Sequence, residues 1–520
     1  MGKPRQLREI FIPSIADLLF ATVLLTLFFS TSTGLLADGD TGYHIRAGEH
    51  ILRSGSIPRL DMFSLHTPPL PWTAHEWLSE VLMAAAHHLF GLSGVVACSA
   101  LLLAGTTSLL FTILRQNHGG ILRPVAITLI ALLSSQIHWL ARPHLFSLLL
   151  MVIFHYLIDS WHVGRANRLY LLPPLMLLWV NLHGGYLGGF ILAGAYLIGN
   201  LAGVPRLHGA QRGARLAKLR QLALAGAACL AVCLVNPYGY AILLFPFRLV
   251  LDGYMMDHVV EFLSPDFHGW LPFKYLLLLL IAALALSRKR LEPSELVLVI
   301  VFTNMALHST RYIPLFALVT APILNGRGDA EAEALKGGLS RFLKERSRRM
   351  AELDSRTAGH LWPAAALVAV AAALWLGEPS HAFDEKAKPI AACEFLMRQK
   401  IAGNMFNNDE FGDYLIYRCY PRYKVFIDGR LDMYGSERLR EYRRVTGFEP
   451  GWESVLEKYG VTWMLIPARS GLSRFLLKDR NWGLIYSDPV ADIFVRKIPE
   501  HRDLLARYRP APAATGGTPQ

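Results

Sequence analysis

The feature that most constrains this chain is a series of about eleven apolar segments, each near the length that crosses a bilayer. Hydrophobic residues make up 53% of the 520 residues and charged residues only 18%. This balance is too apolar for an ordinary soluble protein. The run at residues 275–286 contains no charged side chain. The sequence therefore predicts a polytopic α-helical membrane protein with about 11 transmembrane helices.

The first apolar segment follows Lys3, Arg5 and Arg8. It is too long for a signal peptide, and no small-residue cleavage site follows it, so we expect an uncleaved anchor. The predicted spans cover residues 15–36, 91–114, 124–141, 144–160, 169–182, 184–203, 219–235, 272–286, 294–308, 311–325 and 360–377.

Basic residues fix the predicted orientation, because cytoplasmic loops carry an excess of Lys and Arg. With a cytoplasmic N-terminus, every predicted inward loop is basic; these loops contain Arg115 and Arg123, Arg165 and Arg168, and the stretches 206–220, 288–290 and 344–349. They account for the net charge of +12, so nucleic-acid binding is not expected. The sequence thus predicts a multi-pass protein of the bacterial inner membrane with its C-terminal region in the periplasm.

We expect three regions along the chain. Residues 1–378 form the transmembrane domain, with a first periplasmic loop at residues 38–77. Residues 379–500 form a periplasmic α/β domain, because short β-like runs at residues 424–427, 463–466, 484–486 and 492–495 alternate with helical ones. Residues 501–520 form a disordered tail, rich in Pro, Ala and Gly after Pro510. Cys393 and Cys419 could pair in an oxidising compartment.

Two carboxylates directly follow the first span. Asp38 and Asp40 stand two residues apart at the start of a predicted helix that ends at Gly55. Such a pair can hold a divalent cation or act as a base near a phosphate leaving group. Alternatively, Asp40 only caps the helix that begins at Thr41.

The rest of the first loop suits a structured segment at the membrane surface, with Trp72 and Trp77 at interfacial depth. His75 and Glu76 are candidate ligand residues or supports for one, and a role in stabilising the loop is the alternative. Asp61 is expected to cap a turn.

Four later turns on the outward side carry polar side chains. Ionisable groups at span ends are costly unless they are paired or face water, so we expect a common polar cavity. Arg142 and Arg311 are candidate phosphate ligands, since a guanidinium donates two parallel hydrogen bonds; their alternative is an ion pair with Asp38, Asp40 or Glu76. The other candidates are His144, Asn181, His183, Asn236 and Tyr238.

The C-terminal region adds Glu410, in the run from Asn407 to Leu415, and Asp428 with Arg430 directly after the predicted strand 424–427. Polar residues at the end of a strand are a common position for a site. Asp428 and Arg430 could equally form an ion pair that stabilises the fold.

The start of the first loop resembles the superfamily C (GT-C) glycosyltransferases. Asp40-x-x-x-His44-x-Arg46 is similar to the Asp-x-x-x-Asn-x-Arg motif of oligosaccharyltransferase catalytic subunits, and protein O-mannosyltransferases and lipid A aminoarabinose transferases place acidic residues at the same point. Glu410-Phe411-Gly412 resembles part of the acceptor-reading motif of oligosaccharyltransferases. Both tryptophans of that motif are missing.

The resemblance implies an inverting transfer of a sugar from a polyprenyl-phosphate donor to a lipid, glycan or protein acceptor at the periplasmic face. Asp40, helped by Asp38, would deprotonate the acceptor or hold Mg²⁺ or Mn²⁺. Arg142 and Arg311 would stabilise the leaving phosphate, with the other candidates, His44 among them, contacting substrate. The alternatives are a transporter or flippase for lipid-linked saccharides and a non-catalytic glycan-binding membrane protein.

Overall fold

The computed structural model describes residues 11–30, 34–116, 120–327, 338–357 and 360–508. The chain forms two compact units. The helical unit comprises Met1–Leu35, Ala86–Val250 and Met256–His381, and the α/β unit comprises Leu36–Ala85, Leu251–Met255 and Ala382–Gln520. The first loop thus groups with the C-terminal region, far away in the sequence.

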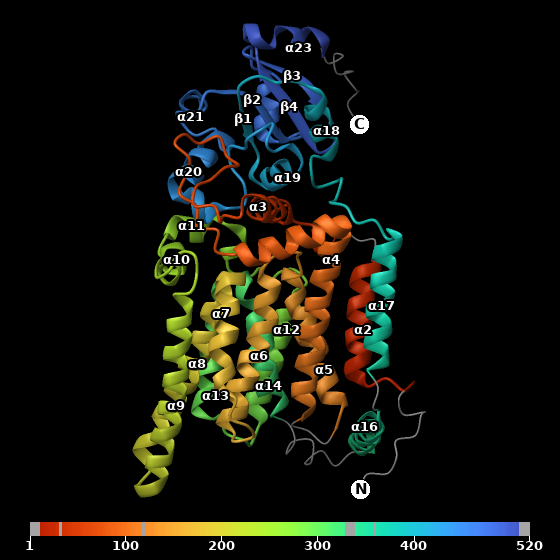
Figure 1. Ribbon diagram of the computed structural model, residues 1–520, viewed down its shortest axis with the longest axis vertical. Coiled ribbons are helices and arrows are strands. Elements are labelled where there is room, and N and C mark those ends of the chain that lie inside the picture. The colour runs from red at the N-terminus through yellow and green to blue at the C-terminus, as the bar shows by residue number, and fades with distance from the viewer. Residues whose placement is uncertain (1–10, 31–33, 117–119, 328–337, 358–359, 509–520) are drawn as a thin grey trace. The chain divides into compact units, whose positions relative to one another are not determined.

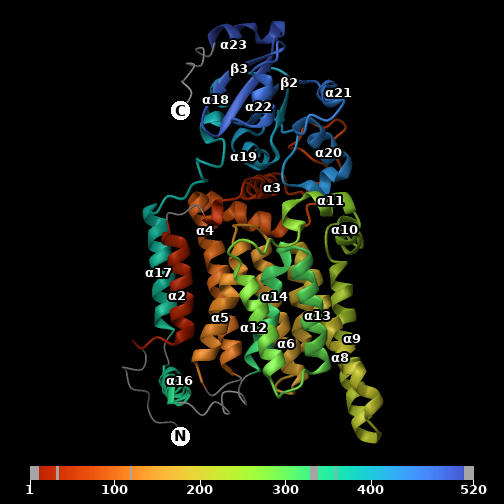
Figure 2. The ribbon, with the colours of Figure 1, turned by 180° about the vertical axis from the view of Figure 1, so that it is seen from behind.

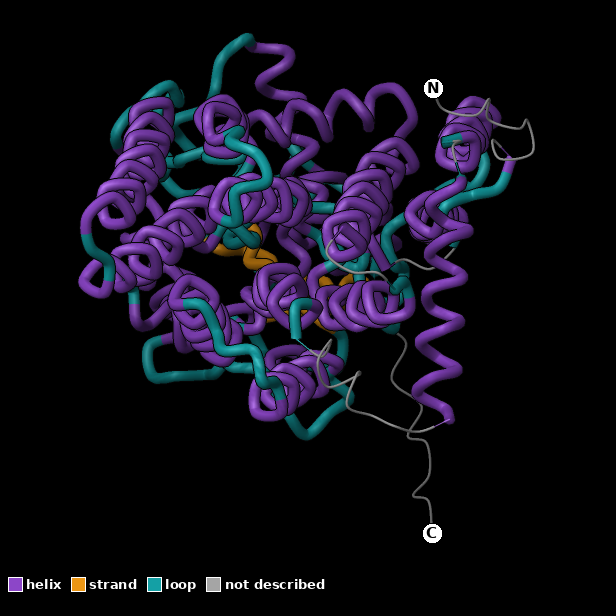
Figure 3. Tube along the Cα trace, turned by 90° about the horizontal axis from the view of Figure 1, so that it is seen from below, coloured by secondary structure: helices purple, strands orange, loops and turns teal. Residues whose placement is uncertain are grey.

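Every predicted span contains a helix (Figures 1 and 2). These helices are α2 (Ile15–Phe29), α4 (Trp77–Gln116), α5 (Leu122–Ser135), α6 (His144–His162), α7 (Leu172–Leu182), α8 (Leu187–Gly203), α9 (Gly209–Cys233), α12 (Pro272–Leu286), α13 (Pro293–His308), α14 (Ile313–Asn325) and α17 (Leu361–Leu376). Two short helices, α10 (Ala241–Val250) and α11 (Gly253–His258), follow α9. Figure 3 shows several of the helices nearly end on.

In the described part of the chain, four helices are long and apolar enough to cross a bilayer by themselves: Trp77–Gln116, His144–His162, Gly184–Gly203 and Gly209–Cys233. Most of the other span helices have 10 to 17 residues. The apolar helices support a membrane protein, and the total of about 11 spans stays a prediction.

Local sequence explains where several helices begin and bend. Ser14 and Asp17 form a reciprocal cap at the start of α2, with Ser14 Oγ accepting from Asp17 N and Asp17 Oδ2 accepting from Ser14 N. Helix α4 is two helices joined at Phe90 and Gly91, whose backbone angles are not helical. The second of them starts where the sequence predicts a span.

Helix α16 (Gly338–Arg356) is amphipathic. Its Ser347 Oγ accepts hydrogen bonds from the backbone N–H groups of Ile121 and Leu122. This contact joins α16 to the start of α5, while Phe342 and Leu353 stay exposed.

The α/β unit is built on a four-stranded sheet in the order β1-β2-β4-β3. Strand β1 (Asn404–Asn407) runs parallel to β2 (Val461–Pro467), whereas β4 (Ala491–Arg496) runs antiparallel to both β2 and β3 (Trp482–Ser487). Its helices are α3 (Asp40–Ser54), α18 (Ile390–Arg398), α19 (Asp409–Cys419), α20 (Leu431–Thr446), α21 (Trp452–Lys458), α22 (Gly471–Leu476) and α23 (Arg502–Arg507).

One of the predicted strands is wrong. Residues 424–427 form no strand; instead Val425 pairs with the first loop, donating its N–H to Phe63 O and accepting from Leu65 N. The fourth strand is β1, which the sequence analysis missed because its Asn-Met-Phe-Asn sequence gives a weak apolar pattern. The other three predicted runs lie in β2, β3 and β4. The buried residues 425–427 therefore hold the first loop against the C-terminal region.

Candidate active site

Helix α3 places the carboxylates of the first loop. It begins at Asp40 and ends at Gly55, the predicted stop, which adopts a left-handed conformation (φ 65°). At Gly42 a Cβ atom would lie 2.7 Å from Tyr417 Cβ and 2.8 Å from Asp413 O. The missing side chain therefore lets α3 pack directly on α19, which brings Asp40 toward the C-terminal residues.

Asp40 does not cap α3. Gly39 holds the cap position and no side chain satisfies it, so the helix-cap alternative is wrong. The backbone N–H of Asp40 donates to Asp38 Oδ1 (3.0 Å), and the Asp40 side chain hydrogen-bonds with Asp413. Asp40 is half-buried, whereas Asp413 is buried. The two acids form a carboxylate pair with one member reachable from solvent.

The pair lies against the backbone at Gly429. Gly429 N donates to Asp413 Oδ1 (3.1 Å), and a Cβ atom at this position would lie 2.6 Å from Asp40 Oδ1. Burial and the nearby Asp428 carboxylate raise the pKa of Asp413 to about 6, against the opposing effects of Asp40, Gly429 N–H and Lys388. One carboxyl of this pair therefore changes its protonation state near neutral pH.

Asp413 and Lys388 were missed by the sequence analysis. Lys388 is buried and its Nζ donates to Glu410 O (3.1 Å), while Glu410 itself is exposed at the start of α19. The available signal was that Asp413 interrupts the otherwise apolar, buried run from Phe411 to Ile416. A charged residue within such a run is costly unless it is paired.

Arg430 forms the ion pair considered as an alternative, and it has two partners. Its guanidinium contacts Asp428 Oδ2 (2.7 Å) and Asp61 Oδ1 (2.9 Å), with the aromatic rings of Phe63 and Trp72 at 5.0 and 4.7 Å. Asp61 also caps a turn, as expected, by accepting from Phe63 N. Arg430 is almost completely buried and joins the first loop to the C-terminal region.

The histidines of the first loop lie beside glutamates. His44 is 3.7 Å from Glu76 and 3.4 Å from Glu80, and His75 is 3.7 Å from Glu76. Burial lowers the pKa of His44 to about 4, outweighing the effect of Glu76, so His44 is neutral near pH 7. Arg46 donates to Tyr417 O and contacts Glu49, which gives it a structural role on α3.

In the helical unit, Arg142 and Arg311 share one carboxylate. Arg142 Nη1 lies 2.7 Å from Glu261 Oε1, and Arg311 Nη1 lies 3.8 Å from Glu261 Oε2. Despite burial, the two arginines and His138 lower the pKa of Glu261 to about 2. The sequence analysis did not single out Glu261, which lies on a 3₁₀ turn (Val260–Phe262).

The remaining outward-side candidates form hydrogen-bonded groups. His144 contacts His138 O (2.6 Å), and His183 contacts the hydroxyl of Ser147 (2.7 Å). Asn236 donates to Asn181 Oδ1 (3.1 Å) and accepts from Tyr238 N (3.0 Å). The turns of residues 181–183 and 236–238 thus meet.

Polar residues of the helical unit also lie away from the four outward turns. At the opposite ends of α6 and α8, Tyr196 donates to Asp159 and Asn200 contacts His162, which lies 2.9 Å from Glu292. These groups satisfy one another, as buried polar groups generally do.

Asp38 and Asp40 are the predicted metal ligands. Within the described residues no group of three or more His, Cys, Asp and Glu side chains is arranged to hold a metal ion. The Asp413 carboxylate beside Asp40 instead accepts from Gly429 N–H and lies near the Lys388 ammonium.

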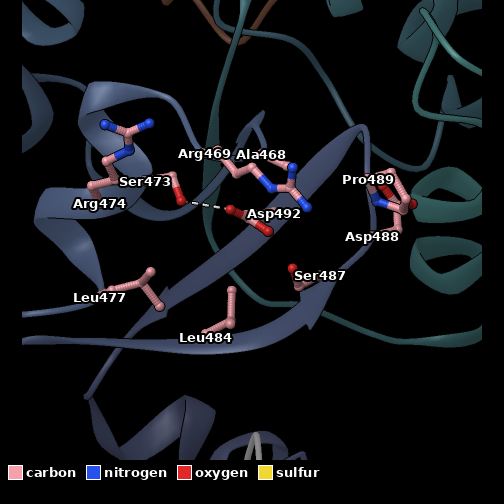
Figure 4. A pocket seen from close by; sticks show the side chains of 10 residues that line it. All are labelled: Ala468, Arg469, Ser473, Arg474, Leu477, Leu484, Ser487, Asp488, Pro489 and Asp492. Carbon is pink, nitrogen blue, oxygen red and sulfur yellow. Dashed lines mark hydrogen bonds between the residues drawn. The ribbon is translucent and has the colours of Figure 1, made fainter. Parts of the chain in front are cut away.

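A cavity of about 570 Å³ lies in the α/β unit between α22 and the hairpin of β3 and β4 (Figure 4). Ser473 donates to Asp492 in it (2.5 Å), and Arg469 and Arg474 are exposed. It contains none of the predicted site residues.

The comparisons with known proteins agree with this architecture. No family model and no curated protein matches the sequence. Among solved structures, the chain is similar to the oligosaccharyltransferase AglB from Archaeoglobus fulgidus in complex with an inhibitory peptide and a dolichol-phosphate. That similarity has a TM-score of 0.54 at 12% identity and covers 93% of this chain and 74% of that one.

The chain is also similar to ArnT from Cupriavidus metallidurans bound to undecaprenyl phosphate. Here the TM-score is 0.50 at 13% identity, and the similarity covers 93% of this chain and 98% of that one. At such low identity the likeness concerns the fold. The chain has the fold of the superfamily C (GT-C) membrane glycosyltransferases.

Proposed function

We propose that the protein transfers a sugar from a polyprenyl-phosphate donor to a lipid, glycan or protein acceptor. The observation that carries the proposal is the position of Asp40, half-buried in a carboxylate pair at the start of the first loop of a GT-C fold. The ligands named for two structures of this fold, dolichol-phosphate and undecaprenyl phosphate, support the donor class.

Asp40 acts as the general base in this proposal. The acceptor oxygen forms a bond to the anomeric carbon while its proton passes to the Asp40 carboxylate, and the bond from the anomeric carbon to the phosphate oxygen breaks. The electron pair leaves with polyprenyl phosphate, so the anomeric centre is inverted by this single displacement. Asp38 holds the backbone of Asp40, and Asp413 sets its charge environment.

Arg142 and Arg311 bind the leaving phosphate. Their guanidinium groups lie close enough to share one carboxylate, which supports their sharing one phosphate in the same way. The charge that develops on the leaving oxygen is stabilised by fixed cations of this kind.

The membrane orientation belongs to the proposal. The basic loops favour a cytoplasmic N-terminus and a periplasmic C-terminal region in a bacterial inner membrane. In intact spheroplasts, a membrane-impermeant thiol reagent should label a cysteine introduced at residues 510–520 and miss one at Gly213. The reverse pattern would overturn this orientation.

The proposed activity is tested by incubating the purified full-length protein with labelled polyprenyl-phosphate sugars and an acceptor mixture. A glycosyltransferase releases one polyprenyl phosphate for each sugar transferred. Donor that moves across a vesicle membrane with its sugar still attached would contradict transfer and indicate a flippase. Adding and then chelating Mg²⁺ or Mn²⁺ tests the predicted metal.

A further inference from the structure

Glu261 occupies the position between two arginines that the proposed function gives to a phosphate. One carboxylate oxygen faces Arg142 and the other faces Arg311, at 2.7 and 3.8 Å. Both guanidinium groups thus contact the same carboxylate. A phosphate has the same two-sided geometry and offers a further oxygen for hydrogen bonds from guanidinium groups.

We infer that Glu261 is an internal competitor for the phosphate site: the phosphate of a polyprenyl-phosphate lipid displaces its carboxylate from Arg142 and Arg311, and the carboxylate returns when the lipid leaves. This inference rests on the proposed function, in which these arginines hold the donor phosphate.

The cluster is accessible enough for such an exchange. The side chains of Glu261 and Arg311 are 29% and 38% exposed, and that of Arg142 is 15% exposed. By contrast, the Arg327 side chain, which forms an ion pair with Glu295, has no exposed surface. An ion pair that solvent reaches can be opened without leaving a buried charge uncompensated, whereas opening the Arg327 pair would leave one.

Only the side chain of Glu261 has to move. Its backbone carbonyl accepts hydrogen bonds from Ser309 Oγ (2.8 Å) and Thr310 Oγ1 (3.0 Å), and Leu263 O accepts from Thr310 N (3.0 Å). These contacts hold the turn in place. Rotation of the Glu261 side chain therefore suffices to vacate the site, without unfolding the segment.

The ring of His138 lies beside this cluster. His138 Nε2 is buried and makes no hydrogen bond to the described residues, although His138 lies close enough to Glu261 to influence its charge. A buried ring nitrogen without a partner is unusual. An incoming phosphate supplies acceptor oxygens in this neighbourhood.

Displacement of Glu261 affects the binding of both the substrate and the product. The donor is a phosphodiester with one negative charge, and the released polyprenyl phosphate is a monoester with a second ionisation near neutral pH. Because both headgroups are anions, Glu261 weakens the binding of both, and that of the product more. It thereby assists the release of the product, a step that limits turnover in many enzymes.

The test measures the Kd of undecaprenyl phosphate for the full-length protein in detergent. Glu261→Gln keeps the shape and the backbone contacts but removes the charge, so binding should tighten about threefold to tenfold. The matched control is Asp159→Asn, because Asp159 pairs with Arg165 at a similar exposure (31%) at the other end of α6. Uncharged undecaprenol should bind both variants and the parent equally.

The outcomes separate this inference from the proposed function. Glu261→Gln could leave undecaprenyl phosphate binding unchanged or weaken it, while Arg142→Lys and Arg311→Lys weaken it. This result would overturn the competitor role but would still support the phosphate site. If neither arginine variant changes the Kd, the phosphate site and the competitor role both fail. Tighter binding in Glu261→Gln together with weaker binding in the arginine variants supports both.

Discussion

The two carboxylate clusters of this protein shift the pKa of a carboxyl group in opposite directions. In the α/β unit, Asp413 lies buried beside Asp40 and near Asp428, and its pKa rises to about 6. In the helical unit, Glu261 lies between Arg142 and Arg311, and its pKa falls to about 2. The difference between these environments is the sign of the neighbouring charge.

This contrast assigns different tasks to the two clusters. A carboxyl that titrates near neutral pH is suited to exchange protons, as general acid–base chemistry requires. A carboxylate held between two guanidinium groups stays charged at every physiological pH, so it marks a site for anions. The proposed reaction needs both tasks: a base for the acceptor proton and cations for the leaving phosphate.

The largest expected effect concerns the framework of the α/β unit. Arg430→Met leaves Asp61 and Asp428 buried without their cation, and we expect a loss of about 3–5 kcal/mol in stability. Thermal unfolding followed by tryptophan fluorescence measures it. Arg418→Met is the control, because Arg418 is exposed on α19. Equal unfolding temperatures for the two variants would show that Arg430 does not join the first loop to the C-terminal region.

The next effect concerns the phosphate ligands of the helical unit. Arg142→Lys or Arg311→Lys keeps the charge but loses the two-pronged donor, at a cost of about 2 kcal/mol, or about thirtyfold in donor Kd. Isothermal titration with a polyprenyl-phosphate sugar measures it, with Arg165→Lys as the control at the opposite end of α6. Donor binding as tight as in the parent for both variants would remove the arginines from the site.

The smallest effect tests the carboxylate pair through pH. The folded state raises the pKa of Asp413 from 3.8 to about 6, so folding favours its protonated form. Stability from this group is therefore full below about pH 4 and declines as pH rises to about 6. Asp413→Asn mimics the protonated form and should be more stable than the parent at pH 8, and nearly equal to it at pH 4.

Unfolding temperatures of the parent and Asp413→Asn across this range give the measurement. Parallel curves from pH 4 to pH 8 would mean that Asp413 does not titrate in this window. Glu261→Gln serves as the comparison from the other cluster: because the pKa of Glu261 is about 2, its difference from the parent should be constant over the same range.

Much of the fold follows from the sequence, because periodicity and length are local signals. Hydropathy located a helix in every predicted span, and Gly55 marked the end of α3. Strand β1 was not predicted because asparagines stand at both ends of its apolar pair. Residues 424–427 were wrongly predicted as a strand because the burial of residues 425–427 comes from pairing with the first loop.

The site was harder to predict, because its partners are distant in the sequence. Asp40 was a clear candidate from its position after the first span. Its neighbour Asp413, the anchor between Arg430 and Asp61, and the pairing of Glu261 with two arginines all depend on tertiary contacts. No local pattern specifies which of the 40 Asp and Glu residues meet a given side chain.

The most direct test of the account separates turnover from donor binding in Asp40→Asn. Single-turnover release of polyprenyl phosphate should fall about 100-fold or more, because the base is lost. The donor Kd should stay within a factor of about two, since the phosphate ligands lie in the other cluster. Undiminished release by Asp40→Asn would contradict the account at its centre.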